Sequence, residues 1–333
     1  MPQKEIANTF KRKFTRLYTE KNFNGTVLLA QNNTVLWQAA LGIADFRNGN
    51  ELSLASTFNL ASVSKPIFAT AILLLKEQRK LRLKDPITKY LPGLYAPGVT
   101  VRHLLHHTSG LADYIELMDE HWTKKRQVEN KDVLRLFQKL QPKLYFSPGS
   151  KFEYSNTGYA FLANIIAKAS GKTVQEFLQQ EIFTELGMAN THLCNAGSPE
   201  SSLQAIGFRS KKTRNKLYHQ TYLDGVSGDG NICSNVTDLL KFDNALRNGK
   251  LLQDATLRKA YKPAKIKGKK SYYGFGWELY PSGDFVEHSG EWQGFRTYFG
   301  RDLSSGYTFI VLDNSNNSAM LDTVQSILDK FYQ

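Results

Sequence analysis

The stretch that decides the fold is NLASVSKPIFATAILLLKEQRK, residues 59–80. Ser62 and Lys65 lie three positions apart, so on a helix their side chains share one face and the amine reaches the serine oxygen. Pro66 favours a helix that begins here, because proline is tolerated only in the first turn. The residues that follow are apolar nearly all round at first, which predicts a buried helix from Pro66 to Lys80.

This pair has two interpretations when it is taken alone. In the first, Ser62 is a nucleophile activated by Lys65. The unpaired backbone N–H groups at the helix N-terminus then favour the negative charge that develops in the reaction. A lysine with the ordinary pKa of about 10.4 is a poor base at neutral pH, so Lys65 must then be desolvated or lie near other cations. In the second, Ser62 is a helix cap and Lys65 a surface residue. The rest of the chain has to decide between them.

The residue patterns at both ends of the chain predict strands and helices. Apolar residues recur at helical spacing over residues 4–20, and residues 25–42 read as two strands around a turn at 31–33. An Asn48–Gly49 turn follows. Short aromatic and β-branched runs return after Gly207, and a helix with one apolar face ends the chain. These C-terminal segments are YYGFGWELY (272–280), DFVEHSG (284–290), GFRTYFGRD (294–302), GYTFIVLDN (306–314) and AMLDTVQSILDKFYQ (319–333).

The middle of the chain predicts helices and loops. Its clearest helices are residues 132–141, 156–171 and 173–187, and Gly171 and Gly187 stand where helix C-caps belong. We therefore predict an α+β fold in which one antiparallel sheet, built from both termini, is flanked by helices. The chain is expected to be a single catalytic domain over residues 1–333. Residues 1–82 and 207–333 form its α/β lobe, residues 83–206 form an inserted, mostly helical lobe, and a cleft lies between them.

Composition limits the classes of protein. The 333 residues are 41% hydrophobic and 22% charged, as in ordinary soluble enzymes, and no run approaches the roughly 20 apolar residues of a membrane-spanning helix. The polar start lacks a secretory leader, so we expect either a cytoplasmic protein or one whose leader was removed. The net charge of +13 is scattered and carries no nucleic-acid-binding motif. We expect no nucleic-acid partner, although the charge favours contact with anionic surfaces.

Two further motifs bear on the serine–lysine pair. Tyr154 precedes Asn156 in a turn before a predicted helix; a phenol near a lysine ammonium loses its proton more easily, and an amide orients a carbonyl substrate. His288, Ser289 and Gly290 end a predicted strand, where glycine allows close approach to a ligand and the next amide, at Glu291, can donate to an oxyanion. A packed tyrosine, a turn asparagine and a solvent-facing histidine are the alternative interpretations. Each would prevail if its motif stood alone.

Together, the ordered motifs S-V-S-K (62–65), Y-S-N (154–156) and H-S-G (288–290) resemble the serine β-lactamase and penicillin-binding-protein superfamily. The resemblance is to the branch related to class C β-lactamases, which includes esterases and D-amino-acid peptidases. It extends over nearly the whole chain through flanking segments. These are VTVRHLLHHTSGL (99–111), FSPGSKFEYSNTGY (146–159), ELGMANT (185–191), GDGNICSNVTDLLKF (228–242) and YGFGWEL (273–279).

The resemblance implies a role for each matching residue. Ser62 is the acylated nucleophile, and Lys65 accepts its proton. Tyr154 shares the base role and protonates the leaving group, while Asn156 binds the acyl side of the substrate and steadies Lys65. The amides of Ser62 and Glu291 form the oxyanion hole.

The resemblance also places His288, Ser289 and Gly290 beside the substrate. Penicillin-specific members usually carry Lys-Thr-Gly there, and this chain has His-Ser-Gly. A histidine is neutral much of the time at pH 7, so recognition of a substrate carboxylate is weakened. We therefore expect a serine hydrolase of esters or amides, β-lactams and D-amino-acid peptides included, that uses no cofactor. The alternative is a penicillin-binding or peptide-sensing protein that acylates or binds without efficient turnover.

Several other residues attract attention for their chemistry. The histidines at 103, 106, 107 and 121 lack a second ligand cluster, so we expect structural roles and no metal. Asp229 and Asp238 are assigned to a turn and a helix cap, because a serine–lysine–tyrosine site needs no triad acid. Trp292 is expected at the rim of a substrate pocket. Cys194 and Cys233 fit no metal or redox spacing; two buried thiols are favoured over one disulfide, which stays open.

Overall fold

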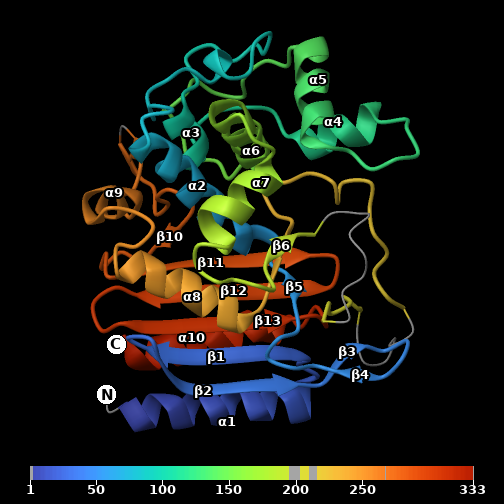
Figure 1. Cartoon of the computed structure of the whole chain (residues 1–333), viewed down its shortest axis with the longest axis vertical. Helices are drawn as coiled ribbons and strands as arrows, with labels where there is room; N and C mark the ends of the chain where they lie inside the picture. The colour runs from blue at the N-terminus through green and yellow to red at the C-terminus, as the bar shows by residue number, and fades with distance from the viewer. Residues whose placement is uncertain (1–2, 195–202, 210–215, 267, 333) are drawn as a thin grey trace.

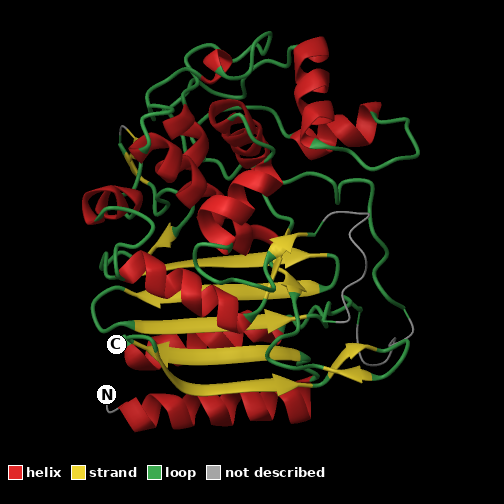
Figure 2. Cartoon of the chain, in the orientation of Figure 1, coloured by secondary structure: helices red, strands yellow, loops and turns green. Residues whose placement is uncertain are grey.

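In the computed structural model, a six-stranded antiparallel sheet lies at one end of the molecule and a cluster of helices at the other (Figure 2). The structure describes residues 3–194, 203–209, 216–266 and 268–332. The strand order is β10-β11-β12-β13-β1-β2. Its members are β1 (Gly25–Gln31), β2 (Thr34–Leu41), β10 (Glu278–Leu279), β11 (Phe285–Trp292), β12 (Phe295–Asp302) and β13 (Tyr307–Asp313).

The sheet joins the two ends of the chain. Strand β1 pairs with β13 from Gly25 opposite Asp313 to Gln31 opposite Tyr307, so an N-terminal hairpin is inserted beside C-terminal strands. Helices α1 (Gln3–Lys21) and α10 (Ala319–Phe331) cover one face. Their apolar stripes pack with alternate residues of β1 and β13 in one buried cluster. The predicted sheet built from both termini is confirmed.

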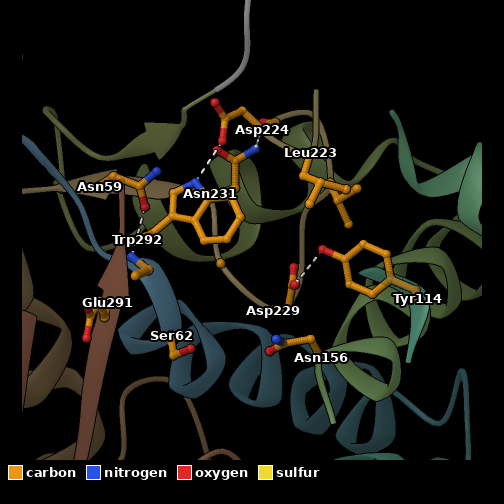
Figure 3. A pocket seen from close by; sticks show the side chains of 13 residues that line it. Asn59, Ser62, Tyr114, Asn156, Leu223, Asp224, Asp229, Asn231, Glu291 and Trp292 are labelled. Atoms are coloured by element: carbon orange, nitrogen blue, oxygen red, sulfur yellow. Dashed lines mark hydrogen bonds between the residues drawn. The ribbon is translucent and has the colours of Figure 1, made fainter. Parts of the chain in front are cut away.

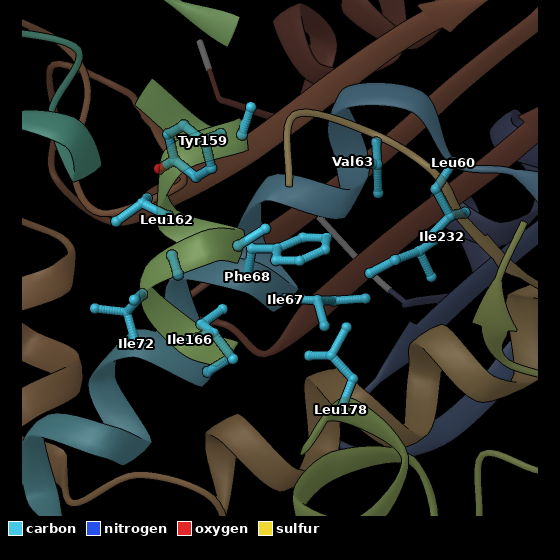
Figure 4. Packing of buried hydrophobic residues seen from close by; sticks show 14 of the residues in the cluster. Leu60, Val63, Ile67, Phe68, Ile72, Tyr159, Leu162, Ile166, Leu178 and Ile232 are labelled. Carbon is cyan, nitrogen blue, oxygen red and sulfur yellow. The ribbon is translucent and has the colours of Figure 1, made fainter. Parts of the chain in front are cut away.

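The second face of the sheet belongs to the main core. Helix α8 (Val236–Arg247) lies against this face in Figure 1, and its Phe242 contacts Phe299 of β12. Helix α2 (Lys65–Glu77) passes from the sheet into the helical cluster. It packs against α6 (Asn156–Ser170), with Ile67, Phe68 and Ile72 among the side chains shown in Figure 4. The sequence of α2 is apolar nearly throughout because the helix is buried on almost every side.

The remaining elements are short. The helices are α3 (Val101–Leu105), α4 (Tyr114–His121), α5 (Asn130–Leu140), α7 (Val174–Leu178), α9 (Asp254–Ala260), the 3-10 turns η1 (Ala61–Ser64) and η2 (Ile87–Lys89), and the π-helical turn η3 (Gln179–Phe183). The strands are β3 (Ile43–Asp45), β4 (Asn50–Glu51), β5 (Phe58–Asn59), β6 (His192–Leu193), β7 (Ile232–Ser234), β8 (Lys265–Ile266) and β9 (Lys269–Lys270). None of the helices in the described ranges is long and apolar enough to cross a membrane.

Two predictions about local structure need correction. The segment 272–280 is mostly turns rather than a strand, and only Glu278–Leu279 joins the sheet. Gly276 explains this, because its φ of +77° is a turn conformation and a Cβ there would lie 2.7 Å from the Cβ of Ala69. The predicted helix over 173–187 ends its α-helical part at Leu178 and continues as the π turn.

The cysteines are not free thiols. Cys194 and Cys233 form a disulfide, with their Cα atoms 5.2 Å apart. Strand β6 pairs with β7 so that His192 stands opposite Cys233, and this brings Cys194 beside the same strand. The favoured prediction of two thiols was therefore wrong. Their 39-residue separation carries no local signal of a pairing that arises only when β6 and β7 meet.

Candidate active site

Ser62 lies in a tight turn at the start of α2. The turn η1 leads directly into the helix, and Pro66 occupies the first helical turn. Ala61 has a φ of +48°, in the left-handed region that residues with a Cβ rarely adopt. The Asn59 side-chain oxygen accepts a hydrogen bond from the Ala61 amide at 2.8 Å and holds this bend. The local sequence thus presents Ser62 at the end of a buried helix.

Lys65 is fully buried beneath Ser62 and donates three hydrogen bonds. Its Nζ lies 2.9 Å from the Oγ of Ser62, 3.0 Å from the Oδ1 of Asn156 and 2.6 Å from the backbone oxygen of Asp229. Burial lowers the pKa of Lys65 to about 7, although the charges of Asp229 and Glu278 oppose this shift. The desolvation that a lysine base requires is therefore present, and the neutral amine is accessible near pH 7.

Tyr154 faces the same pair from the segment before α6. The ring centroid of Tyr154 lies 4.8 Å from the Lys65 Nζ, and the residue is 41% exposed. Burial of its hydroxyl raises the pKa of Tyr154 above the ordinary value, and a hydrogen bond with Ser62 opposes the shift. The expectation that Lys65 helps Tyr154 to lose its proton is not met. The phenol is protonated at neutral pH and suited to donate a proton.

Strand β11 forms the other wall beside the serine. A Cβ at Gly290 would lie 2.9 Å from the amide nitrogen of Ser62 and 2.5 Å from the oxygen of Leu60, so only glycine fits here. Strand β10 pairs with β11 only at Val286 and Glu287. The close approach brings the backbone of β11 next to the Ser62 amide, which is the arrangement that two oxyanion donors require.

The resemblance implies that His288 lies beside the substrate, whereas the structure buries its side chain. It is 1% exposed, and its Nδ1 lies 2.6 Å from the Ser289 oxygen. A carbonyl only accepts, so Nδ1 carries the hydrogen, and Nε2 accepts from the Tyr273 hydroxyl at 2.9 Å. Burial lowers the pKa of His288 to about 3, and the Lys65 charge adds to the effect. The neutral imidazole supports Tyr273, whose ring lies edge-on to that of Tyr154.

A cleft opens above Ser62 (Figure 3). Asn156 and Glu291 line it, as expected of residues near a substrate, and the indole of Trp292 stands at its edge. The full lining is Asn59, Ala61, Ser62, Tyr114, Asn156, Leu223, Asp224, Val226, Asp229, Gly230, Asn231, Glu291 and Trp292.

Tyr114, Asp224 and Asp229 are among the cleft residues that were not predicted from the sequence. Tyr114 donates from its hydroxyl to the Oδ2 of Asp229 at 2.8 Å. The Nε1 of Trp292 donates to the Oδ1 of Asp224 at 2.7 Å. Asp229 was assigned to a turn, and its segment GDGNICSNVTDLLKF (228–242) supported only the resemblance, whereas Tyr114 lies beyond the flanking segment 99–111. The 115 positions between Tyr114 and Asp229 leave no spacing signal for their contact.

The clustered histidines have structural partners. His107 accepts a hydrogen bond from the Ser155 amide at 3.0 Å, and its ring centroid lies 4.3 Å from that of Tyr154. The Nδ1 of His106 lies 3.2 Å from the Tyr273 oxygen. The carboxylate of Asp238 accepts from the Asn190 amide, and the Asp238 amide donates to the Oδ1 of Asn235, which caps α8. Within the described part of the chain, no three His, Cys, Asp or Glu residues are grouped as a metal site.

The fold and the serine–lysine turn beside β11 define the class of serine β-lactamases and penicillin-binding proteins. The model of the family described as Beta-lactamase matches residues 10–331, and the chain belongs to this family of hydrolases. Penicillin-binding protein 4* of Bacillus subtilis (strain 168) is 35% identical over 95% of this chain and 74% of its own. The D-aminopeptidase of Brucella anthropi is 26% identical over 83% of this chain and 53% of its own.

A solved structure is similar over the same extent. The penicillin-binding protein from Bacillus halodurans superimposes with a TM-score of 0.83 at 26% identity, covering 95% of this chain and 98% of its own. The predicted fold and superfamily are confirmed. The comparisons do not assign the individual site residues of this chain.

Proposed function

We propose that the protein hydrolyses esters or amides through an acyl-enzyme on Ser62. The observation that carries this proposal is the 2.9 Å contact between the Nζ of Lys65 and the Oγ of Ser62, at a lysine whose pKa burial lowers to about 7. A serine hydroxyl needs an adjacent base to become a good nucleophile. The neutral amine of Lys65 supplies that base at neutral pH.

The proposed acylation step moves one proton at a time. The Oγ of Ser62 attacks the carbonyl carbon of the substrate while its proton passes to the Nζ of Lys65. The negative charge on the carbonyl oxygen is stabilised by the amides of Ser62 and Glu291, an assignment supported by the close approach of Gly290 to the Ser62 amide. When the bond to the leaving group breaks, Tyr154 donates its proton to that group and recovers one from Lys65.

Deacylation reverses these roles. A water molecule attacks the acyl carbon, its proton passes to the site base, and Ser62 leaves as the hydroxyl. Asn156 is proposed to hold the acyl side of the substrate, because its amide already contacts Lys65 at 3.0 Å. His288, Ser289 and Gly290 form the wall on the other side; His288 contributes there by fixing Tyr273 rather than by contacting substrate.

The site favours substrates other than β-lactams with a free carboxylate. Position 288 carries a buried neutral imidazole instead of a cation. The similarity to a D-aminopeptidase supports amides or esters of D-amino acids as the substrate class.

Kinetics with p-nitrophenyl acetate and butyrate test the proposal. Ser62→Ala is expected to abolish hydrolysis above background. Lys65→Arg is expected to lose most activity, because a guanidinium stays protonated. Full esterase activity in Ser62→Ala would refute the proposal.

A second candidate function is a penicillin-binding protein that acylates without efficient turnover. The 35% identity to penicillin-binding protein 4* favours it. Intact-mass spectra after mixing with a penicillin distinguish the two, because a persistent adduct without product supports this candidate and rapid loss of the adduct supports the hydrolase.

A further inference from the structure

The cleft above Ser62 is acidic. Its lining contains the carboxylates Asp224, Asp229 and Glu291, and no lysine or arginine is among the lining residues that the structure describes. Lys65 lies below the serine, fully buried. This is unexpected in a chain with a net charge of +13. The acidity is therefore a property of this site and not of the whole surface.

Two of the three carboxylates are already occupied. Glu291 forms an ion pair with Arg296 at 2.8 Å. The Oδ1 of Asp224 accepts from the Trp292 indole at 2.7 Å and from the Thr221 hydroxyl at 3.3 Å, and its Oδ2 accepts from the Thr221 amide at 2.6 Å. Both are held by groups at the edge of the cleft, and neither offers a free charge to a ligand.

Asp229 differs from the other two. Its Oδ2 accepts from Tyr114, and within the described ranges its Oδ1 accepts no hydrogen bond from another residue. Burial raises the pKa of Asp229, and the positive charge of Lys65 opposes the shift, so the carboxylate and the ammonium stabilise each other. That compensation ends when Lys65 is neutral, which is the form that accepts the serine proton. The carboxylate then lacks a cation in a largely desolvated site.

The position of Asp229 indicates which part of a substrate it faces. Its backbone oxygen and the Asn156 side chain both accept from the Nζ of Lys65, at 2.6 and 3.0 Å. Figure 3 shows Asp229 directly above Asn156, on the opposite side of the cleft from Glu291. Asn156 marks the acyl side in the proposed mechanism, so Asp229 lies on the acyl side too.

From this juxtaposition we infer that the Asp229 carboxylate binds an ammonium group next to the scissile carbonyl, so that the substrates are esters or amides of α-amino acids with a free amino group. The inference rests on the proposed function and names its substrate class. A substrate ammonium replaces the charge that Lys65 gives up when it acts as a base. An acyl group with a carboxylate in this place is repelled by the same charge.

The test compares two amides that differ only in the amino group, alanyl p-nitroanilide in both enantiomers and propionyl p-nitroanilide. For the unaltered protein at pH 7.5, kcat/KM for the preferred alanyl enantiomer is expected to exceed that for the propionyl amide by roughly tenfold or more, since hydrogen bonds between charged groups are the strong ones. The alanyl rate should fall above a pH of about 8, where an α-amino group loses its proton, while the propionyl rate should not.

Asp229→Asn is expected to bring the alanyl-to-propionyl ratio close to unity, because only the alanyl amide carries the ammonium that the carboxylate binds. Tyr114→Phe removes the neighbouring hydroxyl but keeps the carboxylate, so the ratio should persist. Asp322→Asn, on α10 behind the sheet, removes a distant charge and should change neither rate.

Three results would overturn the inference. An equal fall of both rates in Asp229→Asn would assign the residue a structural role or one through Lys65. Equal rates for the two amides in the unaltered protein would show that no ammonium is recognised, and this result does not depend on the folding of any variant. Continued Ser62-dependent hydrolysis of p-nitrophenyl propionate would then leave the proposed function standing. Absence of that hydrolysis would refute the proposed function and the inference with it.

Discussion

Replacement of Gly290 by alanine tests the geometry of the site directly. The added Cβ would lie 2.5 Å from the oxygen of Leu60 and 2.9 Å from the amide nitrogen of Ser62, whereas ordinary contact begins at 3.4 Å. Strand β11 must therefore move away from η1 by about 0.9 Å at Leu60 and about 0.5 Å at Ser62. These two contacts are to backbone atoms, which cannot rotate aside as a side chain would; a third contact, at 2.5 Å, is to the Oγ1 of Thr297.

The shift separates the two proposed oxyanion donors. Misplacement of about 1 Å can cost roughly a hundredfold in rate, and loss of one oxyanion donor costs about 2.7–4 kcal/mol of barrier. We expect kcat/KM on p-nitrophenyl propionate to fall about a hundredfold or more. The expected loss of stability is about 1–3 kcal/mol, as for an overpacked core position.

The assay pairs these kinetics with urea unfolding. Gly158→Ala in α6 is the matched control, because a Cβ there meets nothing closer than 3.4 Å and should leave the rate nearly unchanged. A folded Gly290→Ala protein with more than a third of the original kcat/KM would refute the assignment of the oxyanion hole to this backbone.

Three further predictions follow from buried groups. Burial lowers the pKa of Lys65 to about 7, so kcat/KM on a neutral ester should rise with pH through an apparent pKa near 7 as the amine loses its proton. A midpoint near the ordinary lysine pKa of 10.5 would contradict the desolvation of Lys65. Replacement of Cys194 and Cys233 by serine should lower the free energy of unfolding by about 2–4 kcal/mol in urea titrations, and no change would show that the disulfide does not stabilise the fold. Asp243→Ala should lower the free energy of unfolding by about 3–5 kcal/mol, because it removes the carboxylate that pairs with the buried Arg301. A decrease of less than about 1 kcal/mol in the same urea titration would contradict a structural role for this ion pair.

The sequence predicted much of the fold because its signals are local. The apolar spacing over 4–20 and the continuous apolar run after Pro66 each reflect a single helix and what it buries. The segment 272–280 misled because aromatic residues suggested a strand, while the positive φ of Gly276 and the close packing of Ala69 impose turns. The disulfide could not be predicted, since it depends on the pairing of β6 with β7.

In the candidate site, too, the local contacts could be predicted from the sequence and the contacts between distant segments could not. Ser62 and Lys65 are three residues apart, so their contact follows from helical geometry. The contact of Tyr114 with Asp229 and the burial of His288 depend on how distant segments pack, and no local pattern encodes them. The pKa of Tyr154 shows the same limit. Sequence alone suggested a lowered value from the nearby lysine, and burial produces a raised one.

The central claim is that Ser62 carries the acyl group, with Lys65 as its proton acceptor. Its most direct test is mass spectrometry of the intact protein and its peptides after reaction with a fluorophosphonate. We expect one adduct per chain, on the peptide that contains Ser62, with no adduct in Ser62→Ala and strongly slowed labelling in Lys65→Arg. Labelling of Ser62→Ala to the same extent, or an adduct on another serine, would contradict it.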